Sequence, residues 1–170
     1  IAAGEVIERP ASVVKELVEN SLDANAKNIW IRVEDGGTSL IVIRDDGHGM
    51  DKEDAVLAFQ KHSTSKIRSF DDLQTVLTSG FRGEALPSIA SVSRLRITTC
   101  SKGDDVGTRI TIEGNNNLNV EEQAAPQGTT IEVADLFFNT PARSKHLKRV
   151  STELQHIVKI VTTEAIRRPD

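Results

Sequence analysis

Residues 10–24 have the sequence PASVVKELVENSLDA, which predicts an amphipathic helix from about Ala11 to Ala24. Pro10 suits the first turn of this helix, because a residue there needs no backbone N–H. Apolar side chains recur at helical spacing and form a single stripe, at Val13, Val14, Leu17, Val18 and Leu22. A helix with one apolar stripe must bury that stripe against a second layer, which the rest of the chain has to supply.

The segments after this helix supply strands separated by turns. Residues 28–34 alternate apolar and polar side chains, whereas residues 40–43 are uniformly apolar and predict a strand buried on both faces. A turn at residues 35–37, Asp-Gly-Gly, joins the two. Further strand patterns occur at residues 93–99, 107–113, 118–121 and 129–134.

Further helices lie between and after these strands. Asp51 can cap a short helix through residue 60, with Asp54 at the fourth position of an approximate capping box. Thr140-Pro141 opens another helix, and Ser151 caps the last one. The predicted apolar face of that last helix comprises Leu154, Ile157, Val158, Val161 and Ala165. Helices before, between and after strands predict an α/β two-layer sandwich.

The composition is typical of one soluble globular domain. The 170 residues suit a single domain, and the net charge of −4 argues against a duplex-DNA surface, which needs an excess of Lys and Arg. Cys100 is the one cysteine, so no internal disulfide can form and a reducing compartment fits. No apolar run approaches the length that spans a membrane. The chain begins at Ile1 rather than Met, and we expect it to be a fragment of a longer protein.

One flank of the first helix carries polar side chains suited to catalysis. At about 100° per residue, Glu16, Asn20 and Asp23 fall within an arc of about 60° beside the apolar stripe. The amide oxygen of Asn20 suits Mg²⁺, which takes oxygen ligands, and a carboxylate one turn away can orient and deprotonate a water. Ordinary polar helix flanks have the same spacing, so spacing alone leaves both interpretations open.

A glycine-containing acidic turn, DDGHG at residues 45–49, follows the apolar strand. Ligands often lie at strand ends in α/β proteins, and Gly47 and Gly49 let the backbone approach a flat ring closely. A carboxylate at the floor of such a pocket can accept a hydrogen bond from the amino group of adenine, whereas guanine presents an acceptor at the equivalent position. A tight acidic turn or part of a cation-binding loop would have the same composition.

Residues 61–84 form a polar, glycine-containing stretch whose end overlaps the sequence GFRGEAL at residues 80–86. A long loop inside a compact domain is usually functional or disordered. Free backbone N–H groups and the positive end of a following helix make residues 80–86 a candidate anion site, although an ordinary loop-to-helix junction looks alike. The stretch is neither a Walker loop nor a complete Rossmann fingerprint.

Other candidate sites are weaker. The histidines, His48, His62, His146 and His156, lack metal-ligand spacing, and with one cysteine a zinc site is not expected. Lys66 follows Thr64 and Ser65 and can reach a phosphate, with a solvated loop lysine as the alternative.

Four segments occur in an order that resembles the four motifs of the GHKL ATPases, the superfamily of gyrase B, Hsp90, histidine kinases and MutL. They are VKELVENSLDA at 14–24, DDGHG at 45–49, GFRGEAL at 80–86 and GTTIEV at 128–133. Three more resemble the MutL group specifically: IAAGEVIERP at 1–10, TSK at 64–66 and DLFFNTPAR at 135–143. The resemblance covers essentially the whole chain, which is identified as a GHKL ATP-binding domain over residues 1–170.

The resemblance implies the Bergerat fold, a mixed β-sheet covered by helices on one face, with ATP and Mg²⁺ as ligands. By position, Glu16 resembles the general base, and Asn20 resembles the Mg²⁺ ligand that also contacts the nucleotide. Asp45 takes the adenine-contacting place, with Gly49 beneath the base and Thr129 beside it. The resemblance further implies a lid around the triphosphate, preceded by Lys66 and formed by Gly80, Phe81, Arg82, Gly83, Glu84, Ala85 and Leu86.

The resemblance also implies an ATPase that acts as a conformational and dimerisation switch in DNA mismatch repair. The family's N-terminal arm would precede Ile1, and its following domain would begin after Asp170, so we expect weak or no activity from the chain alone. The implied partners are a second copy of the protein, a mismatch-recognition protein of the MutS type, and DNA bound by regions outside this chain, with no membrane. The implied location is cytoplasmic and nucleoid-associated in a bacterium, or nuclear in a eukaryote.

Two other function classes remain to be distinguished from an ATPase switch. A non-hydrolysing, nucleotide-dependent scaffold would have no need of the base at Glu16. A histidine kinase would use a similar pocket to phosphorylate a histidine-bearing helix, but this chain has the MutL-type lid sequence instead. Phosphate release, compared with label transfer to protein, separates the three.

Overall fold

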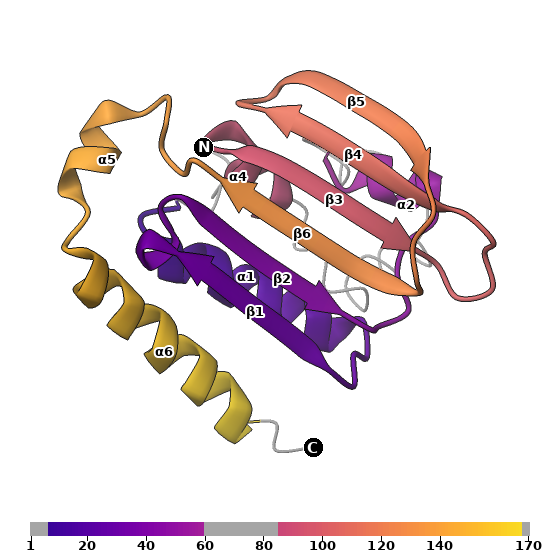
Figure 1. Cartoon of the computed structure of the whole chain (residues 1–170), viewed down its shortest axis with the longest axis horizontal. Helices are drawn as coiled ribbons and strands as arrows, with labels where there is room; N and C mark the ends of the chain where they lie inside the picture. Colours follow the sequence, from indigo (N-terminus) through magenta and orange to yellow (C-terminus); the bar gives the residue numbers. More distant parts are fainter. Residues whose placement is uncertain (1–6, 60–84, 168–170) are drawn as a thin grey trace, which may run out of the picture.

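The computed structural model describes residues 7–59 and 85–167, which form a sheet with helices on one face (Figure 1). The described strands lie in the order β1-β2-β6-β3-β4-β5. The elements are α1 (Pro10–Asp23), β1 (Ile29–Glu34), the 3₁₀ turn η1 (Asp35–Gly37), β2 (Leu40–Asp45), α2 (Lys52–Leu57), α4 (Ala85–Ser91), β3 (Arg94–Cys100), β4 (Gly107–Glu113), β5 (Asn116–Gln123), β6 (Gly128–Ala134), α5 (Pro141–His146) and α6 (Val150–Arg167). The predicted α/β two-layer sandwich is confirmed.

Helix α1 lies over β2 and buries its apolar stripe there, as the sequence predicts. Val13, Val14 and Leu17 are completely buried. Burial of each such side chain contributes about 1.5–3 kcal/mol relative to its exposure. Arg9 occupies the N-cap position without a side-chain capping bond, so Pro10 and the buried stripe define where the helix begins.

The inner face of the sheet consists of aliphatic side chains in register-matched rows. One row contains Ile43, Ile131, Ile97 and Ile110, and the next contains Ile41, Val133, Leu95 and Ile112, each on β2, β6, β3 and β4 in turn. All of these side chains are buried. Because α1 contacts β2 while α4 contacts β3 and β4, the helices cover these rows and form the core with them.

Every pairing among the described strands is antiparallel, whereas the resemblance implies a mixed sheet. Strands β1 and β2, and likewise β3, β4 and β5, are neighbours in sequence that pair directly. Strand β6 then lies between β2 and β3, antiparallel to both.

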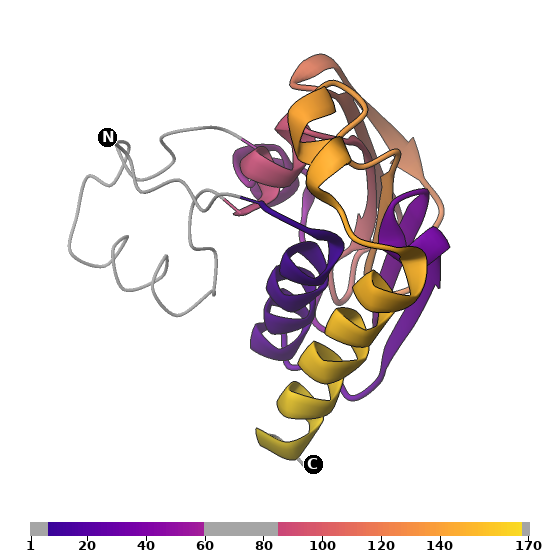
Figure 2. The same ribbon diagram turned by 90° about the vertical axis from the view of Figure 1, so that its left-hand side faces the viewer.

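The prediction that β2 is buried on both faces is wrong. Ile41 and Ile43 are buried, but Val42 is only half-buried and Arg44 is exposed, stacked 4.6 Å from the ring centroid of Trp30. Figure 2 shows the reason, since the described helices that pack on the sheet lie on one side of it. An apolar run alone does not tell a strand buried on both faces from one that is buried on a single face.

Helix α6 packs through a face that matches the predicted one only in part, at Ile157 and Val161. Ile157 is buried where the helix meets α1 and η1, but Leu154 and Val158 are 40% and 55% exposed, and Ala165 is exposed as well. The helix instead buries Glu153 beside Ile157. Within the described residues, no helix has both the length and the apolar character to cross a membrane.

The beginning of α6 also differs from the prediction. Ser151 is the second residue of the helix and not its cap. The Oε1 atom of Glu153 instead accepts the backbone N–H of Lys148 at 3.2 Å. A carboxylate in the first turn of the helix thus satisfies a backbone donor that precedes the helix. At α2, by contrast, the predicted cap is confirmed, because Asp51 accepts the N–H of Asp54 at 2.8 Å.

The glycines of η1 are required where α1 and α6 meet. A Cβ added to Gly37 would lie 2.7 Å from the Cβ of Pro10, and one added to Gly36 would lie 2.9 Å from the carbonyl oxygen of Val150. Both glycines also have positive φ, at 92° and 65°, which side chains disfavour. The predicted turn therefore also serves as the contact surface for two helices.

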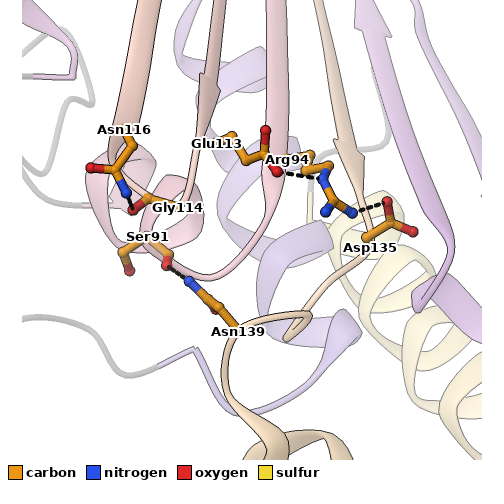
Figure 3. A network of polar contacts seen from close by, with 7 residues as sticks. All are labelled: Ser91, Arg94, Glu113, Gly114, Asn116, Asp135 and Asn139. Atoms are coloured by element: carbon orange, nitrogen blue, oxygen red, sulfur yellow. Dashed lines mark hydrogen bonds and ion pairs between the residues drawn. The ribbon is translucent and has the colours of Figure 1, made fainter.

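A polar cluster ties together the ends of β3, β4 and β6. Figure 3 shows Arg94 donating to Glu113 at 2.8 Å and to Asp135 at 2.7 Å. The guanidinium also lies 4.4 Å from the ring centroid of Phe138. All three charged side chains are about half-exposed, so each ion pair contributes roughly 0–1 kcal/mol.

The same segment, residues 135–140, holds the end of α4. The backbone N–H of Phe137 donates to the carbonyl of Val92 at 2.7 Å, and Asn139 Nδ2 donates to the carbonyl of Ser91 at 2.9 Å (Figure 3). Phe137 is buried at a φ of 67°, a conformation that bulky residues rarely adopt. The DLFFNTPAR segment thus joins α4 to the sheet.

We expect Ile97→Ala to lower the free energy of unfolding by about 2–5 kcal/mol, because it empties the middle of an aliphatic row. Urea denaturation followed by circular dichroism measures the change. Leu118→Ala serves as the control, because that side chain is 49% exposed on β5 and its removal leaves no cavity. Equal losses in the two variants would contradict the described core.

Candidate functional site

Beyond the aliphatic rows, the inner face of the sheet ends in one polar row. It consists of Asp45, Thr129, Thr99 and Thr108, which are register partners on β2, β6, β3 and β4. Each occupies the inward-facing position next to an isoleucine of the neighbouring row. A polar row at the end of an apolar face places hydrogen-bonding groups at the edge of the core, where a ligand can meet both.

Asp45 is the charged member of this row and is only 7% exposed. Ser21 Oγ, from α1, donates to Asp45 Oδ2 at 2.8 Å, and the N–H of Gly47 donates to Oδ1 at 2.9 Å. Burial raises the pKa of the Asp45 carboxyl above its ordinary value. The hydrogen bonds from Ser21, Gly47 and the backbone of Thr129 act in the opposite direction, so they partly compensate the desolvation.

The described hydrogen bonds leave acceptor capacity on Asp45. An ionised carboxylate offers about four lone-pair positions, and Ser21 and Gly47 donate to it at 2.8 and 2.9 Å. A ligand that brings an N–H to this carboxylate would add a further donor. The amino group of adenine has that chemistry.

Asp46 has the opposite environment to its neighbour. It is half-buried and accepts the N–H groups of Lys27 and Asn28, each at 2.8 Å, and Asn28 Nδ2 at 2.9 Å. These hydrogen bonds lower the pKa of the Asp46 carboxyl. Asp46 therefore fixes the turn after α1 to the end of β2, while Asp45 faces the site.

The backbone of the turn at residues 47–50 lies directly against the end of β3. A Cβ on Gly49, where φ is 68°, would lie 2.0 Å from the carbonyl oxygen of Cys100, so only glycine fits. The N–H of His48 donates to the carbonyl of Ala24 at 3.0 Å, and the carbonyl of His48 accepts from the N–H of Lys102 at 3.1 Å. The turn is therefore held from both sides, and its Gly47 N–H donates to Asp45.

Helix α1 carries the predicted catalytic residues on the flank beside its apolar stripe, whereas Ser21 lies within the buried stripe. Asn20 is half-buried and directly precedes Ser21, and Glu16 lies one turn earlier in the helix, 9% exposed. Glu16 lines a hollow of about 590 Å³ between α1 and α6, together with Arg9 and Lys159 among others. Asp45 is not among the residues that line this hollow, so Glu16 and Asp45 lie at different parts of the site.

The structure thus brings together part of the predicted set. Asp45, Gly49 and Thr129 meet at the end of the sheet, and α1 contacts this group through Ser21, the residue after Asn20. Ala85 and Leu86 begin α4 with buried side chains, so only their backbone could contact a nucleotide. Lys66, Gly80, Phe81, Arg82, Gly83 and Glu84 lie outside the described residues, and their predicted roles remain predictions.

Two further site residues were missed in the sequence, Ser21 and Thr99. Both are buried hydroxyls that bond to predicted site residues. The sequence could have predicted Thr99, because in the strand RLRITTC it continues the inward-facing series of Leu95 and Ile97 and is the first polar residue of that series. Ser21 left a weaker one, since a serine inside a helix is common.

Comparison with known proteins agrees with this geometry. Residues 7–141 match the family model described as histidine kinase-, DNA gyrase B- and HSP90-like ATPase. The chain belongs to this ATPase family. Its similarity extends to the MutL group, because all 170 residues align at 58% identity with the DNA mismatch repair protein MutL of Acidobacterium capsulatum and with that of Koribacter versatilis.

Solved structures place the chain in the same part of the family. The ATPase domain of Aquifex aeolicus MutL complexed with ADP superposes with a TM-score of 0.77 at 35% identity, over 96% of this chain and 57% of that one. The chain spans 26% of the length of the A. capsulatum and K. versatilis MutL proteins. The resemblance to MutL ATPase domains expected from the sequence, and the GHKL fold, are therefore confirmed.

We expect Asp45→Asn to stabilise the nucleotide-free domain at neutral pH. The folded state raises the pKa of this carboxyl and therefore favours its protonated form. The contribution of Asp45 to the free energy of unfolding is accordingly lost as the pH rises through the folded-state pKa. An asparagine removes the charge, can still accept from Gly47, and can donate to Ser21. Urea denaturation at pH 5 and pH 7.5 should show an advantage of the variant that grows with pH.

Asp46→Asn is the matched control for this prediction. The pKa of Asp46 is lowered in the folded state, so its ionised form stabilises the fold, and that stability is lost as the pH falls through the folded-state pKa. The variant should therefore be less stable than the unmodified chain at neutral pH. Effects of the same sign in the two variants would contradict the assigned environments.

Proposed function

We propose that this chain binds and hydrolyses ATP with Mg²⁺, and that it acts as a conformational and dimerisation switch in DNA mismatch repair. The observation that carries the proposal is the buried Asp45 carboxylate at the end of the polar row, which accepts from Ser21 and Gly47 and keeps acceptor capacity for a ligand. Its presence in a chain of this ATPase family, and the similarity to a MutL ATPase domain complexed with ADP, support the same conclusion.

Adenine is selected at Asp45 by the direction of its hydrogen bond. The amino group of adenine donates to the carboxylate, and the backbone of Gly49 lies beneath the base. Guanine would place its carbonyl oxygen against the carboxylate, leaving two buried acceptors face to face. Such an unpaired contact costs about 1–3 kcal/mol, more where one group is charged.

Catalysis is assigned to the flank of α1 that carries Glu16 and Asn20. The amide oxygen of Asn20 would hold Mg²⁺ together with phosphate oxygens and water, which is how this ion is usually bound. When bound, Mg²⁺ neutralises charge on the phosphates. Glu16 accepts a proton from the water that attacks the terminal phosphate, and Lys66 with residues 80–86 encloses the triphosphate through backbone N–H groups.

The wider biology is proposed for a longer protein, because the chain spans 26% of its MutL relatives. ATP binding would bring two copies together, and the dimer would engage a mismatch-recognition protein of the MutS type. DNA would bind to regions outside this chain, in keeping with its net charge of −4. Since the relatives named above are bacterial, we place the protein in the cytoplasm, near the nucleoid.

Glu16→Ala should lower ATP turnover by roughly 100-fold or more and leave the Kd for ATP nearly unchanged, because the carboxylate acts on water and not on the nucleotide. Because the chain alone is expected to be a slow ATPase, phosphate release is followed with the protein in excess over radiolabelled ATP. Glu19→Ala, on the same helix, is the control and should retain turnover. Equal loss of binding and turnover would assign Glu16 a structural role, and label found on the protein would favour a kinase.

Asn20→Ala should weaken binding of Mg·ATP much more than binding of adenosine, since only the triphosphate shares the metal. Calorimetric titrations of both ligands, with Mg²⁺ and with EDTA, measure the difference. Asn119→Ala, an exposed asparagine on β5, is the control and should change neither affinity. If adenosine affinity fell as much as that of Mg·ATP, the metal-ligand assignment would be wrong.

A further inference from the structure

The hydroxyl of Thr99 lies at a junction of hydrogen bonds behind the candidate adenine site. It is 1% exposed and lies 2.9 Å from the backbone N of Met50, 3.2 Å from the carbonyl oxygen of Gly128, and 2.8 Å from Thr129 Oγ1. Thr99 and Thr129 are register partners on β3 and β6, and Asp45 is the partner of Thr129 on β2. The three side chains therefore follow one another along the polar row.

The number of protons at this junction limits what Thr129 can present. A hydroxyl has one proton and two lone pairs. Thr99 accepts the N–H of Met50, so its own proton goes either to the carbonyl of Gly128 or to Thr129 Oγ1. In the first case Thr129 donates its proton to Thr99, and only the lone pairs of Thr129 remain for a ligand. In the second case Thr129 accepts from Thr99, and its own proton is available to a ligand.

We propose that Thr99 is a positioning residue for base recognition, because it donates to Thr129 and thereby directs the Thr129 hydroxyl proton toward the ligand. The row then presents an acceptor at Asp45 and a donor at Thr129. This pair matches the edge of adenine, whose amino group donates and whose ring nitrogen N1 accepts. The proposal rests on the proposed ATP binding and adds to it a hydrogen bond from the Thr129 hydroxyl to N1.

Two features of the described residues favour this direction. The 3.2 Å distance from Thr99 Oγ1 to the Gly128 carbonyl oxygen is longer than the roughly 2.5–3.0 Å usual for an O–H donor, so this carbonyl competes weakly for the Thr99 proton. Thr129 is also half-buried while Thr99 is buried, so Thr129 is the hydroxyl that a ligand can reach, directly or through one water. A chain of donors, each polarising the next, strengthens the terminal O–H as a donor.

The test compares ATP with 1-deaza-ATP, which has C–H in place of N1 and keeps the amino group. Calorimetry on the unmodified chain should show roughly three- to tenfold tighter binding of ATP, the factor of one neutral hydrogen bond. Thr99→Val should reduce this ratio to nearly one. Thr99→Ser, which keeps the hydroxyl, should restore it, and Thr98→Val, on the opposite face of β3, should leave it unchanged.

The ratio separates positioning from a purely structural role. If Thr99→Val weakens binding of both nucleotides equally, Thr99 only supports the pocket and the proposal is overturned. If that variant does not fold, Thr129→Val provides the test, because it removes the reading hydroxyl and must abolish the preference for ATP; a retained preference overturns the proposal. Failure of the unmodified chain to bind ATP at all would instead refute the proposed function.

Discussion

The buried carboxylate of Asp45 is the constraint on which the rest of the site depends. A negative charge at the end of an apolar sheet face is costly unless hydrogen bonds replace its water. Ser21 on α1 and the N–H of Gly47 provide these bonds, so the helix, the strand β2 and the turn after it must meet at this point. The raised pKa of Asp45 shows that the compensation is incomplete. That residual cost is what a donor on a ligand can relieve.

The sheet divides its inner face between stability and binding. The aliphatic rows on β2, β6, β3 and β4 hold the helices, and the next row on the same strands is polar. Register is the link between the two, because a slip of one residue would turn both the isoleucines and Asp45 to the outer face. Because the site residues lie on central strands, the pairing of those strands also holds the site.

Helix α1 connects the core to the chemistry. Its stripe, which includes the buried Ser21, fixes the helix on β2, and the flank beside that stripe carries Glu16 and Asn20. Contacts with α6 and with the glycines of η1 hold the helix from a second side. Rotation of α1 about its axis would break the core contacts of its stripe. The packing of the stripe therefore also fixes the positions of Ser21, Asn20 and Glu16.

The sequence by itself determined the elements and the motif that carries Asp45. Helical spacing located α1, strand patterns located all six described strands to within a few residues, and four ordered motifs indicated the ATPase family. These features are local, and they can be read from neighbours along the chain. Only the tertiary structure decided that α6 buries Glu153 and exposes Val158, and that Ser21 and Thr99 serve Asp45 and Thr129. Those relations join residues 24 or more positions apart, and they depend on which strand pairs with which and which helix covers each face, because packing between distant segments leaves no periodic signal in either one.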